Sequence, residues 1–224
     1  MSQELVEARR PLKSRSTWWA KQLAGRLHRF GLTPNQVSLL SMGCAAVGGA
    51  GLLLYAVFDS AVFRIAALLI AILGIQSRLL CNLLDGMLAI ECGLKSKSGE
   101  IYNEIPDRIS DIVIFICAGL ACGEASYLIL SGVTLGMLAA IGSLFTAYVR
   151  MTGAACGTPH FFTGPMAKQQ RMAALSAACL IQIILVFRGS ALNIFPVSLA
   201  IMILGILWTA WRRLKLIVSF LEQR

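Results

Sequence analysis

Six long apolar segments constrain the fold of this 224-residue sequence more than any other feature. They lie at 36–57, 62–90, 105–121, 127–149, 172–187 and 194–211. A helix that crosses a membrane needs roughly 20 predominantly apolar residues. The chain is also 57% apolar and only 14% charged, whereas soluble domains average about 45–50% and about 25%. The sequence therefore predicts an all-α integral membrane bundle of six transmembrane helices, and it excludes a soluble or disordered domain.

A basic segment precedes the first apolar segment, so we expect no cleavable signal peptide. Within it, Trp18, Trp19, Leu23, Leu27 and Phe30 recur at roughly helical spacing with cations between them. This pattern is typical of an amphipathic helix in the membrane interface, although an ordinary solvated leader is the alternative. We divide the chain into a cytoplasmic basic segment at 1–35, the membrane domain at 36–218 and a cytoplasmic tail at 219–224.

The net charge of +9 indicates orientation in a membrane, because too little chain is exposed to water to bind nucleic acid. With six spans, both termini share one side with the loops at 91–104 and 150–171, and these four segments hold sixteen of the twenty Lys and Arg residues. The positive-inside rule places that side in the cytoplasm. We therefore expect a protein of the bacterial inner membrane. The seven Cys residues show no CxxC spacing, which argues against zinc or a disulfide framework.

Six of the eleven acidic residues lie between positions 85 and 111. Asp85 belongs to the apolar stretch LLCNLLDGMLAI, and Asp111 opens the stretch ISDIVIFICAGL. An ionisable group inside a span costs at least a few kcal/mol on insertion scales, so it indicates a functional site by default.

The spacing of these residues predicts converging oxygen ligands. Asn82 and Asp85 share one helix face, and Asn103, Asp107 and Asp111 form an every-fourth stripe on the next helix. The two helices run antiparallel, so their acid-bearing ends meet near the cytoplasmic surface. Oxygen ligands of this kind suit a hard divalent cation such as Mg²⁺. The alternative is a set of hydrogen bonds between spans, with Arg78 or Arg108 neutralising a carboxylate.

Small residues beside the acids leave one side of the second predicted helix without bulk. Gly86 and Ala89 would let a flat ligand approach the backbone closely. Close helix packing explains the same residues equally well.

The segment NLLDGMLAI, followed by ECGLKSKS and GEIYNEIPD, resembles the signature of the CDP-alcohol phosphotransferases. That signature reads DxxDGxxAR, about eight residues, then GxxxDxxxD. The segments GLTPNQVSLLSM, AYVRMTGAACG and GPMAKQQRM also look like parts of that family. The resemblance therefore covers most of the chain and implies six spans.

The chain departs from the signature at named positions. Asn82 stands at the first Asp and Ile90 at the Arg. In a first register, Asn103 and Asp107 occupy the third and fourth Asp positions. A second register moves the pair to Asp107 and Asp111. We prefer the first register because it needs no inserted turn.

The resemblance implies transfer of a substituted phosphoryl group from a CDP-alcohol, such as CDP-diacylglycerol, to an acceptor alcohol, with release of CMP. It also implies a Mg²⁺ or Mn²⁺ cofactor, membrane lipid as a partner and, as is common in the family, a homodimer. The implied metal ligands are Asn82, Asp85, Asn103, Asp107 and Asp111, with Asp107 or Asp111 as catalytic residue. Asp85, Gly86, Ala89 and Gly99 are the implied nucleotide-binding residues. Arg150, Lys168 and Arg171 are candidates for a phosphate of the acceptor, or simple positive-inside charges.

Two other functions fit the same residues. A non-catalytic relative would keep the fold and bind nucleotide or lipid. An ion or proton carrier would use the same carboxylates, but the acids crowd one end and mark no path through the membrane.

Overall fold

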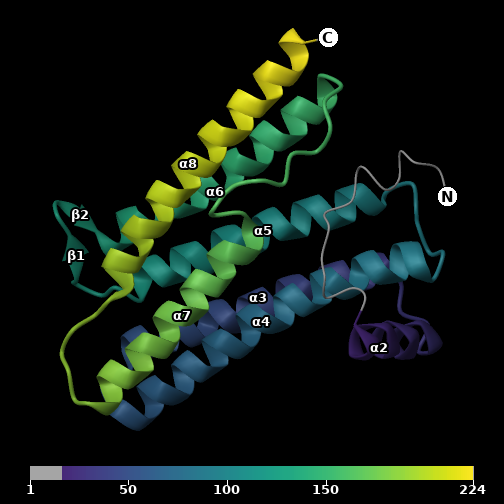
Figure 1. Ribbon diagram of the computed structural model, residues 1–224. Helices are drawn as coiled ribbons and strands as arrows, with labels where there is room; N and C mark the ends of the chain where they lie inside the picture. The colour runs from purple at the N-terminus through teal and green to yellow at the C-terminus, as the bar shows by residue number, and fades with distance from the viewer. Residues whose placement is uncertain (1–16, 224) are drawn as a thin grey trace.

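The computed structural model describes residues 17–223, which form seven α-helices and one short β-hairpin (Figure 1). The helices are α2 (Trp18–Arg29), α3 (Pro34–Val57), α4 (Ala61–Glu91), α5 (Gly99–Leu120), α6 (Gly132–Ala155), α7 (Lys168–Phe187) and α8 (Phe195–Glu222). The hairpin pairs β1 (Ser126–Tyr127) with β2 (Leu130–Ser131).

Helix α2 is amphipathic, as the sequence predicts for this part of the basic segment. Trp18 and Phe30 are exposed, whereas Ala20 and Ala24 are buried in a small apolar cluster that includes residues of α4. Figure 1 shows α2 lying beside the last turns of α4. The predicted segment also includes residues 1–16, which lie outside the described residues. Its location in a membrane interface stays a prediction.

The turn into α3 carries a complete capping box. The Gln36 backbone N–H donates to Thr33 Oγ1 at 3.3 Å, and the Thr33 N–H donates to Gln36 Oε1 at 2.9 Å. Pro34 follows at the first helical position, where its missing N–H costs nothing. These contacts fix the start of α3 and thereby the position of Ser38, one turn further along.

Five described helices, α3, α4, α6, α7 and α8, are long and apolar enough to cross a membrane. Helix α5 has the length for a span, but its first half carries the acidic and basic residues that the sequence analysis singled out. The structure therefore supports a mostly helical membrane bundle and leaves the sixth span as a prediction.

Several predicted boundaries are wrong. Residues 126–131 form the hairpin, so α6 begins at Gly132 rather than at 127 and the fold is not strictly all-α. Helix α5 begins at Gly99, before the predicted 105, because polar residues form its first turns. Helix α7 begins at Lys168, before the predicted 172, for the same reason. Helix α8 continues to Glu222, into the segment predicted as a tail from 219.

Glycines bring neighbouring helices into close contact. A Cβ on Gly74 of α4 would collide with the backbone of Gly48 on α3. A Cβ on Gly119 of α5 would lie 2.9 Å from the Cα of Gly136 on α6. Small residues at such contacts let membrane helices approach by van der Waals packing, which replaces the hydrophobic effect there. Helix α7 packs against α4, and α8 against α6, so the charged ends of α4, α5 and α7 can meet (Figure 1).

Candidate active site

Three buried carboxylates lie where the charged parts of α4 and α5 approach each other. Asp85 is 4% exposed, Asp107 is 5% exposed and Asp111 is 1% exposed. Asp85 lies within electrostatic range of Asp107 and of Lys168 on α7. A buried carboxylate costs several kcal/mol of desolvation unless a partner compensates it. The partners of each acid therefore decide what the site can do.

Asp111 is held between two arginines from different helices. Arg78 Nη2 on α4 lies 2.7 Å from Oδ1, and Arg171 Nη2 on α7 lies 2.7 Å from Oδ2. Both guanidinium groups are almost completely buried. Arg171 also donates from Nη1 to the Thr146 hydroxyl and to the Met166 carbonyl. Each oxygen of Asp111 thus has a cationic partner of its own.

Asp107 shares Arg78 with Asp111 and has Lys168 as a second cationic partner. Lys168 Nζ contacts its Oδ1 as an ion pair, and Arg78 Nη2 lies 3.6 Å from that oxygen. Arg78 also donates to the Asp107 main-chain carbonyl at 3.0 Å. We call these five residues the inner cluster: Arg78, Asp107, Asp111, Lys168 and Arg171.

Asp85 has a different environment. Its Oδ2 accepts a hydrogen bond of 2.6 Å from the hydroxyl of Ser38 on α3. Ser38 is itself buried, and its carbonyl accepts from the Ser41 hydroxyl at 2.6 Å. A neutral hydroxyl therefore supports Asp85, whereas guanidinium and ammonium groups support the two acids of α5.

A second set of charges lies toward the start of α5. Glu104 accepts from Arg150 on α6 at 2.7 Å and from Arg108 at 2.9 Å. Arg150 also lies over the Phe162 ring, 5.0 Å from its centroid. We call Glu104, Arg108 and Arg150 the outer cluster.

The other predicted residues lie around these clusters or outside them. Asn103 is exposed, whereas Asp107 and Asp111 point inward from the same helix. Asp107 belongs to the motif in both registers, and the choice between the two registers stays a prediction. Asn82 is half-buried, and its Nδ2 is a buried donor with no partner among the described residues. Gly86, Ala89 and Gly99 are half-buried, and Gly99 begins α5.

The three cations predicted to bind an acceptor phosphate lie on helices, and each of them pairs with an acid of α5. Lys168 and Arg171 belong to the first turn of α7, not to a loop, and both pair with acids of α5. Arg150 belongs to α6 and pairs with Glu104. The loop before α7 is shorter than predicted, because α7 begins at its cationic residues.

The structural alternative considered for the acids is partly confirmed. Arg78 does neutralise a carboxylate of α5, and Arg108 neutralises Glu104. The charge of Arg78 inside an apolar segment was the signal for this role. Ser38 was missed, because a serine in an apolar helix gives no sign of its partner 47 positions away.

The residues do not fit the divalent metal site that the resemblance implies. No group of three or more His, Cys, Asp or Glu side chains within residues 17–223 is placed to hold a metal ion. Arginines occupy both oxygens of Asp111, Lys168 pairs with Asp107, and Asn103 points away. A hard cation such as Mg²⁺ or Mn²⁺ takes several oxygen ligands that no other cation already holds.

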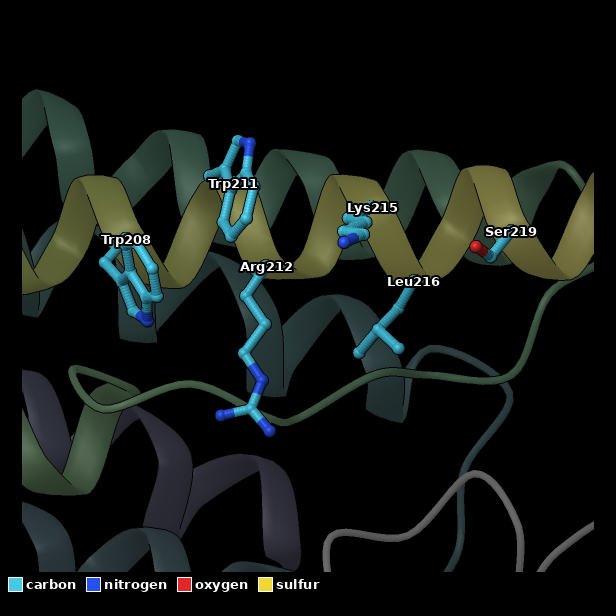
Figure 2. A pocket seen from close by; sticks show the side chains of 6 residues that line it. All are labelled: Trp208, Trp211, Arg212, Lys215, Leu216 and Ser219. Carbon is cyan, nitrogen blue, oxygen red and sulfur yellow. The ribbon is translucent and has the colours of Figure 1, made fainter.

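A furrow lined by residues of α8 contains no residue of either cluster. Figure 2 shows it along α8, lined by Trp208, Trp211, Arg212, Lys215, Leu216 and Ser219. The two tryptophan rings lie 5.0 Å apart, and Lys215 lies near the second ring. Exposed tryptophans with nearby cations are typical of a membrane interface. The furrow contains none of the predicted site residues.

The fold and the apolar helices define an integral membrane protein. No protein-family model matches the chain. Inner membrane protein YnbA of Escherichia coli (strain K12) is 26% identical over 145 residues. That match covers 65% of this chain and 65% of YnbA, so the chain spans just under two thirds of the length of this relative.

Two crystal structures of phosphatidylinositol phosphate synthase (PgsA1) from Mycobacterium tuberculosis share the fold. The structure with CDP-DAG bound has a TM-score of 0.68 and 19% identity, and the match covers 88% of this chain and 92% of the synthase chain. The complex with manganese and citrate has a TM-score of 0.69 and 19% identity, with 89% of each chain covered. At this identity the likeness shows the fold.

Proposed function

We propose that this protein transfers a substituted phosphoryl group from a CDP-alcohol, CDP-diacylglycerol in the first instance, to an acceptor alcohol, with release of CMP. The observation that carries the proposal is the burial of Asp85 and Asp107, the motif acids, at the facing charged ends of α4 and α5. The fold shared with a synthase solved with CDP-DAG supports the choice of substrate class.

Asp107 is the residue we assign to proton transfer. Lys168 and Arg78 both approach its Oδ1, which leaves Oδ2 for the hydroxyl of the acceptor. The hydroxyl gives its proton to Asp107 while its oxygen bonds to the phosphorus remote from cytidine. The bond from that phosphorus to the bridging oxygen breaks, and CMP leaves with that oxygen. Asp85, held by Ser38, lines the same site.

The remaining expectations join this proposal. Helix α5 is the sixth span, both termini and the site face the cytoplasm, and the protein lies in a bacterial inner membrane. Membrane lipid surrounds it, and homodimers are expected. YnbA, whose printed name places it in an inner membrane, supports the location.

Release of CMP by purified protein in lipid vesicles or detergent tests the proposal. With CDP-diacylglycerol and a panel of acceptor alcohols, we expect CMP release that Asp85→Asn and Asp107→Asn each abolish. The matched control is Glu124→Gln, which removes an exposed acid beside the hairpin. Release that survives both aspartate variants, or no release with any acceptor, contradicts the proposal.

A non-catalytic relative is the second candidate, favoured by the ion pairs that occupy Asp107 and Asp111. Such a protein would bind the CDP-alcohol without turning it over. Calorimetry that detects binding, together with no CMP release across the acceptor panel, selects this second function.

A further inference from the structure

Three cations surround three acids in the buried site. Arg78, Lys168 and Arg171 lie on α4 and α7, and they contact Asp107 and Asp111. With Asp85 included, the site has three carboxylates for its three cations. Asn82 and Asn103 stand at positions where the motif has acids in the first register, so two negative charges are absent. The charges of the site therefore balance through side chains alone.

The buried guanidinium groups still have unused donors. Nε and Nη1 of Arg78, and Nε of Arg171, are buried without a hydrogen-bond partner among the described residues. Arg78 is 0% exposed and Arg171 is 1% exposed. Buried polar groups of native proteins are nearly always paired with protein, water or ligand. The oxygens of a phosphate or diphosphate match the planar donor geometry of arginine.

A divalent ion has little reason to enter this cluster. Four carboxylates would attract it strongly, but here it would meet a balanced set with three cations close by. Its ligands would also have to leave the arginines that hold Asp111 at 2.7 Å on each oxygen. A diphosphate has the opposite preference, because the unpartnered donors of Arg78 and Arg171 can bind its oxygens in a low-dielectric site.

We propose that Arg78, Lys168 and Arg171 supply the positive charge that a divalent ion would otherwise supply, so that this site binds the diphosphate of a CDP-alcohol without a metal ion. The proposal rests on the proposed function for the identity of the ligand. In this proposal the three cations bind the diphosphate of the CDP-alcohol rather than a phosphate group of the acceptor alcohol.

Binding of Mn²⁺ by purified protein, followed by electron paramagnetic resonance of the free ion, tests the metal half without any turnover. We expect the native chain to bind no Mn²⁺ below about 1 mM, a level that corresponds to very weak affinity. The variant with Asn82→Asp and Lys168→Met should gain a site at least about tenfold tighter. Tight Mn²⁺ binding by the native chain that disappears in Asp85→Asn overturns the proposal.

Binding of CDP-diacylglycerol in detergent, measured by calorimetry in EDTA and again with excess Mg²⁺, tests the diphosphate half. We expect affinities equal within about twofold in the two buffers and at least about tenfold weaker binding by Lys168→Met and by Arg78→Lys. Lys95→Met, which changes an exposed lysine of the loop after α4, is the matched control and should bind as the native chain does. Loss of binding in EDTA, or equal loss in the control, overturns the proposal.

The two experiments separate this proposal from the proposed function. Metal-independent binding without CMP release removes only the transferase activity. Metal-dependent binding with CMP release removes only the inference about the cations. Thermal unfolding of each variant identifies a variant that has failed to fold, and Arg171→Met then replaces it in the same two measurements.

Discussion

The inner and outer clusters use the same chemistry in different surroundings. In the inner cluster, the side chains of Arg78, Arg171 and Asp111 are at most 2% exposed, whereas Asp107 is 7% and Lys168 is 16% exposed. In the outer cluster, Arg150 is 8%, Arg108 is 19% and Glu104 is 20% exposed. The Arg78–Asp111 pair of the inner cluster and the Arg150–Glu104 pair of the outer cluster have the same N–O distance, 2.7 Å. Water can replace a lost partner of Glu104 but not of Asp111. Burial, not geometry, therefore sets what each ion pair contributes to the fold.

The largest expected effect comes from Asp111→Ala, which leaves two buried guanidinium groups without their carboxylate. Removing one partner of a buried pair typically costs about 3–5 kcal/mol. We expect thermal unfolding in detergent to show a loss of that size. The comparison fails if Glu104→Ala, made as the control in the outer cluster, destabilises the protein as much.

Replacing the whole charged set should recover most of that loss. The variant with Arg78→Met, Asp111→Leu and Arg171→Leu buries no charge at these positions, and apolar replacements of buried ion pairs are often neutral or stabilising by about 1–4 kcal/mol. Unfolding measurements should place it near or above the native chain and well above Asp111→Ala. A triple variant as unstable as the single one shows that the ion pairs hold the helices together beyond neutralising charge.

Ser38→Ala sharpens the contrast between Asp85 and the acids of α5. The change removes the only side-chain hydrogen bond that the described residues make to Asp85, and hydrogen bonds to charged groups contribute about 1.5–3 kcal/mol. Ser41→Ala removes a neutral bond to a carbonyl instead and should cost about 0.5–1.5 kcal/mol. Equal losses in chemical denaturation would mean that Asp85 draws no support from its hydroxyl partner.

The smallest expected effect is that of Glu104→Gln. Partly exposed ion pairs contribute about 0.2–1 kcal/mol and weaken as salt screens them. The difference in unfolding temperature between this variant and the native chain should shrink between low and high salt. If this difference in unfolding temperature is the same at low and high salt, the ion pairs of Glu104 behave as the buried ones of the inner cluster do.

The membrane helices were predictable because each is long and apolar enough to give a signal independent of its neighbours. Helices α3 and α4 match their predicted ranges to within two residues at each end, and α8 begins one residue after its predicted start but continues to Glu222. The hairpin at 126–131 was not predictable from the sequence, because a short apolar run such as the one containing Tyr127 and Leu130 fits a helix as well as a strand. The start of α7 at Lys168 was not predicted either. Lys168 and Arg171 are typical of a loop unless their ion pairs with Asp107 and Asp111 of α5 are known.

The candidate site divides in the same way. Helical spacing located Asp85, Asp107 and Asp111, and all three are buried. It did not decide between the two registers, since spacing along one helix says nothing about which turn faces inward. The cationic partner Arg171 comes from α7, 60 positions along the chain from Asp111. Contacts at that separation depend on packing, which no local pattern encodes.

The two arginines that pair with Asp111 come from helices made before and after α5, which bears on the order in which the ion pairs can form. Arg78 and Asp111 lie on consecutive helices, so they can pair as soon as α4 and α5 have been synthesised. Arg171 and Lys168 emerge from the ribosome later, on α7. Asp111 therefore has one cationic partner before α7 follows, and Arg171 and Lys168 add the remaining ion pairs of Asp111 and Asp107. A chain that ends before α7 would lack the ion pairs that Lys168 makes with Asp107 and Arg171 makes with Asp111.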